Sequence, residues 1–481
     1  MVVQHNMQAA NASRVLGITQ SAQAKSTEKL SSGYRINRAA DDAAGLSISE
    51  KMRKQIRGLD QASTNAQDGV SSVQTAEGAL TEVHSMLQRM NELAVQAANG
   101  TNSESDRSSI QDEIDQLTTE IDRVAETTKF NETYLLKGGN GDKTYHVHAH
   151  DAGLDGTLIE NTTTATFQMK NLRVGDTYAI GGTTYSIGAD SVGEALKILE
   201  NGKDNDANKT KESTGLNTGD TITIDGKSYT IVGSDSEADM EQAKITAAKV
   251  FKIANSGSTI SYNGKSVSVF SSDTASGTDA KVDPNNKTLI NSAKAYEMVR
   301  AELKAASTIG ATGTAAEVGA VSDAKTVNGA TFREFTITRG SVTTKNDLTF
   351  NLHVGSDADM TNKIGVTIEK MDSKNLGLDG INVSDDTGKA ATYAIDAIAD
   401  AVAKVSAQRS ALGAVQNRLE HTIANVDNVV ENTNAAESRI RDTDMADEMV
   451  TYSKNNILAQ AGQAMLAQAN QSTQGVLSIL G

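Results

Sequence analysis

The stretch DAAGLSISEKMRKQIRGLDQASTNAQDGVSSVQTAEGALTEVHSMLQRMNELAVQAAN (42–99) decides the fold, because small or apolar residues recur in it every seven positions. Two such series run in parallel: Gly45, Met52, Leu59, Ala66, Val73, Leu80, Leu87 and Ala94, with Ile48, Gln55, Ala62, Gly69, Ala76, Val83, Met90 and Ala97. Together they predict the a and d positions of a coiled coil, with two weak positions. A helix over this stretch would be about 87 Å long, which is too long to fold back into a compact domain.

The sequence also indicates where this helix begins and ends. Asp41 and Asp42 are suited to cap its start, and Asn99-Gly100 tolerates the left-handed turn that often closes a helix. Ser103 with Asp106 resembles a capping box. Apolar residues at four-three spacing then predict a second, shorter helix: Ile110, Ile114, Leu117, Ile121 and Val124.

Near the other end of the chain, a further seven-residue series predicts another long amphipathic helix: Ile398, Val405, Leu412, Leu419 and Val426. A helix with one apolar stripe draws most of its stability from packing that stripe. The two chain ends should therefore associate. We expect a mainly α fold, in which both ends build a long antiparallel coiled-coil or helical-bundle stalk.

The outermost segments, 1–33 and 443–481, carry fewer apolar residues, which are too sparse to form a complete core. We expect them to bury their apolar faces against other copies of the molecule, and to stay partly disordered until they do. The residues assigned to this self-assembly are Leu16, Leu30, Ile457, Leu458, Leu466, Val476, Leu477 and Leu480.

Charge and composition exclude several classes of protein. The 481 residues carry a net charge of −16, which argues against a nucleic-acid partner, and the absence of Cys excludes thiol chemistry. Residues 1–58 hold nine basic and four acidic side chains, so this segment is net positive although the chain is acidic; it forms either an intersubunit contact or a solvated face. No apolar run approaches the ~20 residues that span a bilayer, and the first residues lack the pattern of a cleaved signal peptide. We expect no membrane partner.

The middle of the chain, 138–345, has a different composition, rich in Gly, Ser, Thr, Asn and Asp. Three similar stretches each place two alternating strands around a turn: GDTYAIGGTTYSIG (175–188), GDTITIDGKSYTIV (219–232) and GSTISYNGKSVSVF (257–270). Helix-like segments follow them at 192–199, 238–253 and 289–305. We therefore expect a surface-exposed β-rich (α+β) insertion of three tandem ββα units.

Candidate catalytic and metal sites are weak. His146, His148 and His150 would share one face of a strand, but same-face positions lie nearly 7 Å apart, so three imidazoles could reach one metal only if the strand bent strongly. A solvated strand face is the favoured reading. Neither His-Glu-x-x-His, nor a Gly-rich phosphate loop followed by Lys, nor a Gly-x-Ser-x-Gly elbow occurs. We expect no enzyme, no catalytic residues, no metal and no cofactor.

Four segments closely resemble bacterial flagellin: LSSGYRINRAADDAAGLSISEKMRKQIRGLDQASTNAQDGVSSVQTAEGAL (30–80), LQRMNELAVQAANGTNS (87–103), SAQRSALGAVQNRLEHTI (406–423) and ILAQAGQAMLAQANQ (457–471). The resemblance covers about 1–137 and 346–481. It implies a structural subunit that assembles into the extracellular flagellar filament for motility and is exported without a cleaved signal peptide.

The resemblance also implies an organisation and a set of partners. Terminal helices of the filament core would come from 1–40 and 441–481, and a long-helix bundle from 41–137 and 346–440, with a β-hairpin at 348–371 that rejoins the bundle after the insertion. The implied partners are further copies of the chain, the flagellar export apparatus, a flagellin chaperone on the C-terminal helix, and the filament cap and hook-junction proteins. A host Toll-like receptor would bind the residues that match its recognition face: Gln88, Arg89, Glu92, Leu93 and Glu113.

Two alternatives stay open on the sequence alone. A hook–filament junction protein shares the terminal helices, although the density of matches disfavours it. A monomeric secreted adhesin or immune ligand would act through the insertion, and it would not form filaments.

Overall fold

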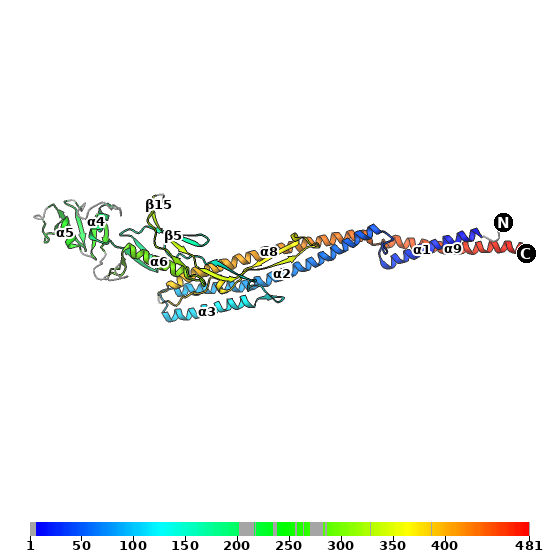
Figure 1. Ribbon diagram of the computed structural model, residues 1–481, viewed down its shortest axis with the longest axis horizontal. Coiled ribbons are helices and arrows are strands. Elements are labelled where there is room, and N and C mark those ends of the chain that lie inside the picture. The colour runs from blue at the N-terminus through cyan, green and yellow to red at the C-terminus, as the bar shows by residue number, and fades with distance from the viewer. Residues whose placement is uncertain are drawn as a thin grey trace. The chain divides into compact units, whose positions relative to one another are not determined.

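The computed structural model describes residues 6–480 apart from 202–215, 217, 234–237, 255–256, 263, 270–281, 284–285, 328 and 386; of 197, 200, 201, 247, 248, 327 and 472–480 it describes only the backbone. The fold is mainly α with a β-rich central region, as the sequence predicts. In Figure 1 long helices from both ends of the chain, blue and orange to red, contrast with the shorter elements of the middle in green.

The helices carry the labels of Figure 1. In chain order they are α1 (Met7–Ser32), α2 (Ala43–Ala98), α3 (Glu104–Thr127), α4 (Val192–Asn201), α5 (Ala247–Ile253), α6 (Ser292–Thr308), α7 (Ser373–Leu376), α8 (Lys389–Arg441) and α9 (Met445–Leu480), with a 3-10 turn at Met360–Asn362. None of them, within the residues described, is both long enough and apolar enough to cross a lipid bilayer.

The strands are short and form several small sheets. They are β1 (Lys129–Phe130), β2 (Thr133–Tyr134), β3 (Asp142–His146), β4 (Thr157–Glu160), β5 (Thr164–Lys170), β6 (Thr177–Ile180), β7 (Thr183–Ile187), β8 (Thr221–Ile224), β9 (Lys227–Val232), β10 (Lys244–Thr246), β11 (Thr259–Tyr262), β12 (Lys265–Ser268), β13 (Leu289–Ile290), β14 (Glu317–Val318), β15 (Lys325–Val327), β16 (Ala330–Thr338), β17 (Ser341–Lys345), β18 (Leu348–His353) and β19 (Lys363–Ile368). The two larger sheets have the orders β10-β9-β8-β11-β12 and β14-β16-β5-β4.

The chain divides into two compact units. The first comprises Met1–Gln74, Phe350–Val366 and Gly413–Gly481, and the second comprises Thr75–Thr349 and Thr367–Leu412. These boundaries fall inside α2, β18, β19 and α8. The three-part division expected from the sequence, with limits near 40, 137, 345 and 440, therefore stays a prediction.

The heptad pattern of α2 is confirmed over most of its length. From Leu59 to Ala97 every position of the two series is buried. Towards the start of the helix the pattern fails, because Ile48 is 47% exposed and Gln55 is also exposed. The seam is therefore complete within the chain only in the later part of α2.

Only part of the predicted capping of α2 is correct. Asp42 caps the start, since its Oδ1 accepts a hydrogen bond from the backbone N–H of Gly45 at 2.8 Å. Asp41 instead accepts from the N–H groups of Asn37 and Arg38 in the preceding loop. Gly100 does not adopt the left-handed conformation expected of it.

The other predicted helices are present. All five seam residues of α8, from Ile398 to Val426, are buried, and the capping box of Ser103 and Asp106 at the start of α3 has both of its hydrogen bonds. A hairpin of β18 and β19 occupies the segment at 348–371, and in the first unit its Leu352 and Ile364 belong to a small core with Ala66 and Leu419. Gly69 allows the hairpin to approach α2 closely, because a Cβ at this position would overlap a methyl carbon of Leu352.

Two hydrophobic cores lie among the described residues of the insertion, both in the second unit. In one, α6 packs with β5, β16 and the β6–β7 hairpin around Phe167 and Phe335. In the other, α4 and α5 pack with the five-stranded sheet that begins at β10. The expected tandem order of these elements is wrong in one respect, because two of the hairpins have exchanged their helices.

The exchange follows from the short segment in front of each helix, which pairs in parallel with one hairpin and so decides where the helix packs. Only the middle hairpin, β8–β9, keeps its own helix, through β10 and α5. The first hairpin instead pairs with β13, where Ile290 lies opposite Ile187, and β13 leads into α6. The third hairpin pairs with Ala189, which bridges Val269 and precedes α4. The segment 238–253 is also not one helix, since β10 ends at Thr246 before α5 begins.

The backbone angles at the predicted hairpin turns agree with the residues found there. Asp225 and Gly226 have φ values of 50° and 81°, and Gly181 and Gly182 have 54° and 77°. Two successive positive φ angles define the tight turn whose twist matches that of paired strands. In the third hairpin Gly264 has φ 75°, and Asn263 lies outside the described residues.

Candidate self-association surface

The two tails form an antiparallel helix pair within the first unit. Helices α1 and α9 lie side by side. The Asn6 side chain donates to the carbonyl of Ala469 at 3.1 Å, Leu16 packs beside Gly462, and Lys29 lies 3.4 Å from Glu448. These contacts fix the register of the pair.

The pair buries very little of its own apolar surface. Among the described side chains of α1 and α9, only Ser26 and Ala459 are buried. A substantial set of large apolar side chains is exposed: Met7, Val15, Ile18, Met445, Met449, Val450, Ile457, Leu458 and Met465. Exposed apolar surface on this scale usually marks an interaction site.

Part of this surface forms a groove of about 630 Å³ between the two helices. Val15 of α1 lies on one wall, and Leu458, Gly462 and Met465 of α9 lie on the other. Small residues, such as Ala12, keep the groove open. The groove can therefore accept apolar side chains from outside the pair.

The structure sorts the eight predicted self-assembly residues into three groups. Ile457 and Leu458 are exposed, whereas Leu16, Leu30 and Leu466 are half-buried, and the side chains of Val476, Leu477 and Leu480 lie outside the described residues. Val15, Ile18, Val450 and Met465 are exposed to a similar extent but were not among the predicted residues. Their signal was present, because both tails carry apolar residues on more than one helix face.

Two short connections beside the pair hold each other in place. Tyr34, after α1, forms a β-bridge with Asp442, after α8. The N–H of Arg35 donates to the Arg441 carbonyl at 2.7 Å, and the N–H of Thr443 donates to the Gly33 carbonyl at 3.0 Å. Gly33 allows the chain to leave α1, because its φ of 77° is a left-handed conformation.

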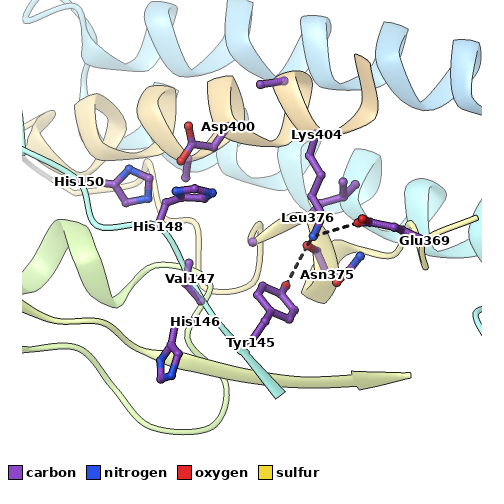
Figure 2. A pocket seen from close by; sticks show the side chains of 13 residues that line it. Tyr145, His146, Val147, His148, His150, Glu369, Asn375, Leu376, Asp400 and Lys404 are labelled. Carbon is purple, nitrogen blue, oxygen red and sulfur yellow. Dashed lines mark hydrogen bonds and ion pairs between the residues drawn. The ribbon is translucent and has the colours of Figure 1, made fainter. Parts of the chain in front are cut away.

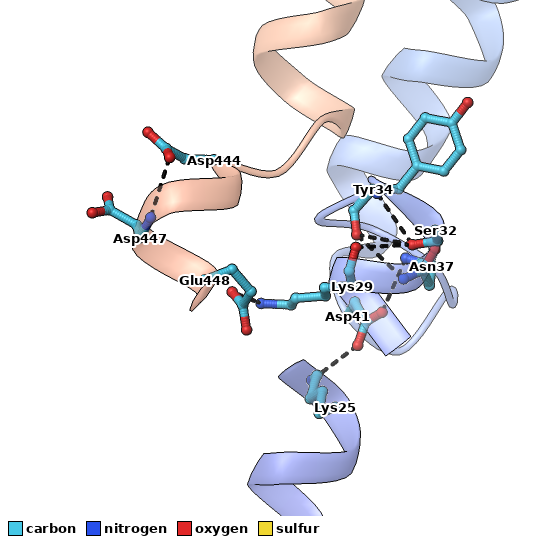
Figure 3. A network of polar contacts seen from close by, with 9 residues as sticks. All are labelled: Lys25, Lys29, Ser32, Tyr34, Asn37, Asp41, Asp444, Asp447 and Glu448. Atoms are coloured by element: carbon cyan, nitrogen blue, oxygen red, sulfur yellow. Dashed lines mark hydrogen bonds and ion pairs between the residues drawn. The ribbon is translucent and has the colours of Figure 1, made fainter. Parts of the chain in front are cut away.

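Figure 3 shows the polar network around these connections. Lys29 reaches Glu448 of α9, and Lys25 of α1 lies 2.9 Å from Asp41. The hydrogen bond from Lys25 lowers the pKa of Asp41 to about 2. Asp444 begins α9 by accepting from the N–H of Asp447 at 3.2 Å. The end of α1 is thus tied by charged contacts to the connection that follows it and to the start of α9.

Tyr34 contributes a second kind of contact to this region. The guanidinium carbon of Arg441 lies 5.0 Å from the centroid of the Tyr34 ring, and the guanidinium carbon of Arg53 lies 5.9 Å from it. Arg53 also lies 3.5 Å from the largely buried Glu437. Such cation–π contacts restrain the aromatic ring between two basic side chains. These contacts could not be predicted from the sequence, because the proximity of the residues depends on two connections that are far apart in the chain.

The predicted receptor face lies in the second unit, on α2 and α3. Arg89 Nε is 2.9 Å from Glu113 Oε1, and Arg89 Nη1 is 3.2 Å from Glu92 Oε2. The hydrogen bond that Arg89 donates to Glu113 is the main reason that the pKa of Arg89 is raised. Gln88 is exposed on the same helix, within 3.1 Å of His84. Gln88, Arg89, Glu92 and Glu113 thus form an exposed polar cluster.

Leu93 does not belong to that exposed cluster. Its side chain is only 2% exposed, because position 93 faces the buried side of α2, next to the seam residue Ala94. Leu93 therefore offers almost no surface to a partner in this structure, and its role in receptor contact stays a prediction.

The three histidines are also placed differently from the prediction. Strand β3 ends at His146, so the following residues do not continue its alternation. His146 approaches the Arg339 carbonyl, His148 Nδ1 lies 2.8 Å from Glu160, and His150 Nδ1 lies 3.6 Å from Asp396. Across the described residues, no group of three or more His, Cys, Asp or Glu side chains is arranged to hold a metal ion.

Figure 2 shows the pocket of about 420 Å³ that these histidines line together with α8. On its other side Lys404 donates to the Asn375 carbonyl at 2.6 Å and lies 4.7 Å from the centre of the Tyr145 ring. Burial lowers the pKa of Lys404 and raises those of Tyr145 and Asp400. The pocket thus mixes cationic and acidic groups, which does not favour one class of ligand.

Long helices from both chain ends, a β-rich middle and exposed apolar tails define a helical structural protein built for association. Comparison with known proteins agrees. Residues 3–141 match the bacterial flagellin N-terminal helical region, and residues 395–480 match the bacterial flagellin C-terminal helical region.

Whole-chain relatives extend this match through the insertion. A flagellin of Clostridium tyrobutyricum is 38% identical over 474 residues, which are 98% of this chain and 100% of that protein. The flagellin of Bacillus subtilis (strain 168) is 34% identical over 482 residues, covering 100% of both chains. The solved structure of FliC from Burkholderia pseudomallei is 21% identical, covers 73% of this chain and 99% of its own, and gives a TM-score of 0.27.

The chain belongs to the bacterial flagellin family. It is a structural subunit of the flagellar filament, and its relatives form the flagellum, an extracellular appendage. No comparison favours the junction-protein or adhesin alternatives.

Proposed function

We propose that the chain polymerises by burying the apolar faces of α1 and α9 against the same helices of neighbouring copies. The observation that carries this proposal is the imbalance within the tail pair, where nine large apolar side chains are exposed and one apolar side chain, Ala459, is buried among those described. At about 25 cal/mol for each Å² of apolar surface removed from water, covering such a surface gives a large driving force for association.

The tail pair presents different surfaces to different neighbours. The groove accepts side chains, whereas Ile457 and Ile18 project as exposed apolar side chains that could fill a groove on another copy. A contact between two unlike surfaces repeats without closing, and it then generates a helical filament. Tyr34 and the charged contacts around it would hold the tail pair in one orientation while the filament grows.

The purified full chain should form long filaments at moderate salt above a critical concentration. The physical reason is the apolar surface of the tails, which stays in water until a neighbour covers it. Sedimentation across a concentration series, with negative-stain microscopy of the pellet, measures this. A chain that stays monomeric and soluble at every concentration contradicts the proposal.

We further propose that Gln88, Arg89, Glu92 and Glu113 form the surface recognised by the host Toll-like receptor. The four side chains lie on one exposed patch, and the ion pairs of Arg89 hold its guanidinium in a fixed place. Pre-ordered Arg side chains are frequent at the centre of protein interfaces. Exposed ion pairs contribute little to folding, so the same residues can serve recognition.

Arg89→Ala should reduce binding of the unpolymerised chain to the receptor ectodomain at least about tenfold. Arg123→Ala is the matched control, because Arg123 forms a similar exposed pair with Glu120 on α3. Surface plasmon resonance of both variants and the wild type gives the comparison. Equal affinity of Arg89→Ala and wild type, or an equal loss in both variants, rules out this surface.

The other proposed partners and the export route rest on family resemblance. A chaperone on the C-terminal helix would cover Met449, Val450 and Ile457, which are exposed in the free chain. The export apparatus would bind the same tails before assembly, and the filament cap and the hook-junction proteins would contact them during and after assembly. In this scheme 1–40 with 441–481 build the filament core, 41–137 with 346–440 surround it, and 138–345 faces solvent.

A further inference from the structure

The insertion contains a second cavity, of about 390 Å³, that the filament function does not use. It lies between α6, strand β16 and the segment around residues 320–321. One helix face supplies Ser292, Tyr296 and Arg300, and alternate positions of β16 supply Arg333 and Phe335. The cavity is thus built on two regular elements of one hydrophobic core.

Neighbouring groups hold both arginines at the wall of this cavity, where Arg300 is exposed and Arg333 is half-buried. Arg300 Nε donates to the Val318 carbonyl at 2.7 Å. Arg333 Nε donates to Asn171 Oδ1 at 2.8 Å, and its guanidinium carbon lies 5.0 Å from the centre of the Tyr296 ring. One further nitrogen of Arg333 donates to the Ser322 carbonyl. The guanidinium groups are therefore positioned before any ligand arrives.

Several donors remain unused in this arrangement. Within the described part of the chain, the two terminal nitrogens of Arg300 and Nη2 of Arg333 have no hydrogen-bond acceptor. Neither guanidinium lies within ion-pair distance of a carboxylate among those same residues. Glu297 also lines the cavity, but it lies 3.9 Å from Lys294, which offsets its charge.

We propose that this cavity binds a small oxyanion, the carboxylate or phosphate group of a solute or sugar, between Arg300 and Arg333. A guanidinium offers paired N–H donors whose spacing matches two oxygens of a carboxylate or phosphate. Two such groups directed at one cavity raise the local positive potential in a chain whose net charge is −16. That net charge disfavours a large polyanion and leaves a small anion as the suitable ligand.

The test titrates the unpolymerised full chain by calorimetry at low salt in a buffer without oxyanions. Inorganic phosphate and glucuronate are the two probes, and they distinguish a phosphate from a carboxylate source. We expect saturable binding of one or both. Arg300→Gln should weaken it at least about tenfold, because the charged donors are lost while a side chain able to reach the Val318 carbonyl is kept.

Lys304→Gln is the matched control, since it removes one positive charge from an exposed position of the same helix outside the cavity. It should change the affinity less than about twofold. Arg333→Lys provides a second variant, which keeps the charge but loses the paired donors and should also weaken binding. Absence of saturable binding of both probes overturns the proposal, as does an equal loss in Arg300→Gln and Lys304→Gln.

Discussion

Ile457→Asp is expected to abolish filament formation and leave the folded monomer unchanged. Ile457 is 66% exposed in the chain, so a carboxylate there stays hydrated in the monomer. In a filament the same position would be covered by a neighbour, and burying an unpaired carboxylate costs at least ~3 kcal/mol. That cost raises the critical concentration by more than about a hundredfold.

Sedimentation and circular dichroism together check this expectation. The variant should stay in the supernatant at concentrations where the wild type pellets, with an unchanged helical signal. Leu466 is a less informative position, because it is half-buried within the chain and its replacement also disturbs the α1–α9 pair.

Ile159→Asp is the matched control for exposure and chemistry. Ile159 lies on β4 of the insertion and is 46% exposed. If apolar exposure anywhere on the chain drove assembly, both variants would fail to polymerise. If Ile457→Asp forms normal filaments, this face of α9 is not part of the assembly interface.

The long helices could be predicted because their signal is local and repeated. Every position of the two heptad series from Leu59 onward is buried, and spacing alone determines which helix face these positions occupy. The exposure of Ile48 could not be predicted in this way. The same spacing continues there, but whether a partner covers it depends on the rest of the chain.

The helix exchange in the insertion shows where local patterns stop being informative. The sequence places α4 directly after the first hairpin, yet Ala189 pairs with Val269 of the third hairpin. Similar repeats offer similar apolar faces, so a helix can pack on any of them. The choice is made by long-range strand pairing, for which the sequence of one repeat carries no signal.

The candidate sites show the same limit at the level of single side chains. His146, His148 and His150 alternate in sequence, but β3 ends at the first of them, so the three imidazoles contact different partners. The resemblance to the family supplied the residue types of the receptor face. It could not show that Leu93 is buried while Arg89 is exposed, because both lie on the same helix.

Arg107 is expected to be the most important single polar residue for the stability of the second unit. It lies on α3 with its side chain inside the protein, since the residue is only 3% exposed. Its Nε donates to the Ala97 carbonyl at 2.9 Å, and Nη2 donates to the Asn99 carbonyl at 3.3 Å. These carbonyls lie at the end of α2, where the helix leaves its last C=O groups without partners.

The same side chain also secures the segment that leads into α8. Nη1 of Arg107 donates to the Asp385 carbonyl at 3.3 Å, and a Cβ on Gly388 would lie 3.2 Å from Nη2. Gln111, one turn later on α3, accepts from the N–H of Val383 at 2.7 Å. One face of α3 thus joins the end of α2 to the approach to α8.

Arg107→Met should lower the free energy of unfolding of the second unit by ~3 kcal/mol or more. Met roughly fills the space of the Arg side chain, but it takes the Arg107 donor away from the Ala97 and Asp385 carbonyls, whereas the Asn99 carbonyl keeps the N–H of Asn102. It also removes a cation from the negative end of the α2 dipole. Arg107→Lys should cost less, because Lys restores the charge and one donor.

Denaturant unfolding of the unpolymerised chain gives the size of the loss, and hydrogen exchange gives its location. Faster exchange is expected at the amides around 97–102 and 383–391, where the contacted carbonyls lie. Arg123→Ala, on the exposed face of the same helix, should leave both measurements unchanged. If Arg107→Met unfolds at the wild-type denaturant concentration, the buried guanidinium does not hold these helix ends together, and their order must come from the apolar seam alone.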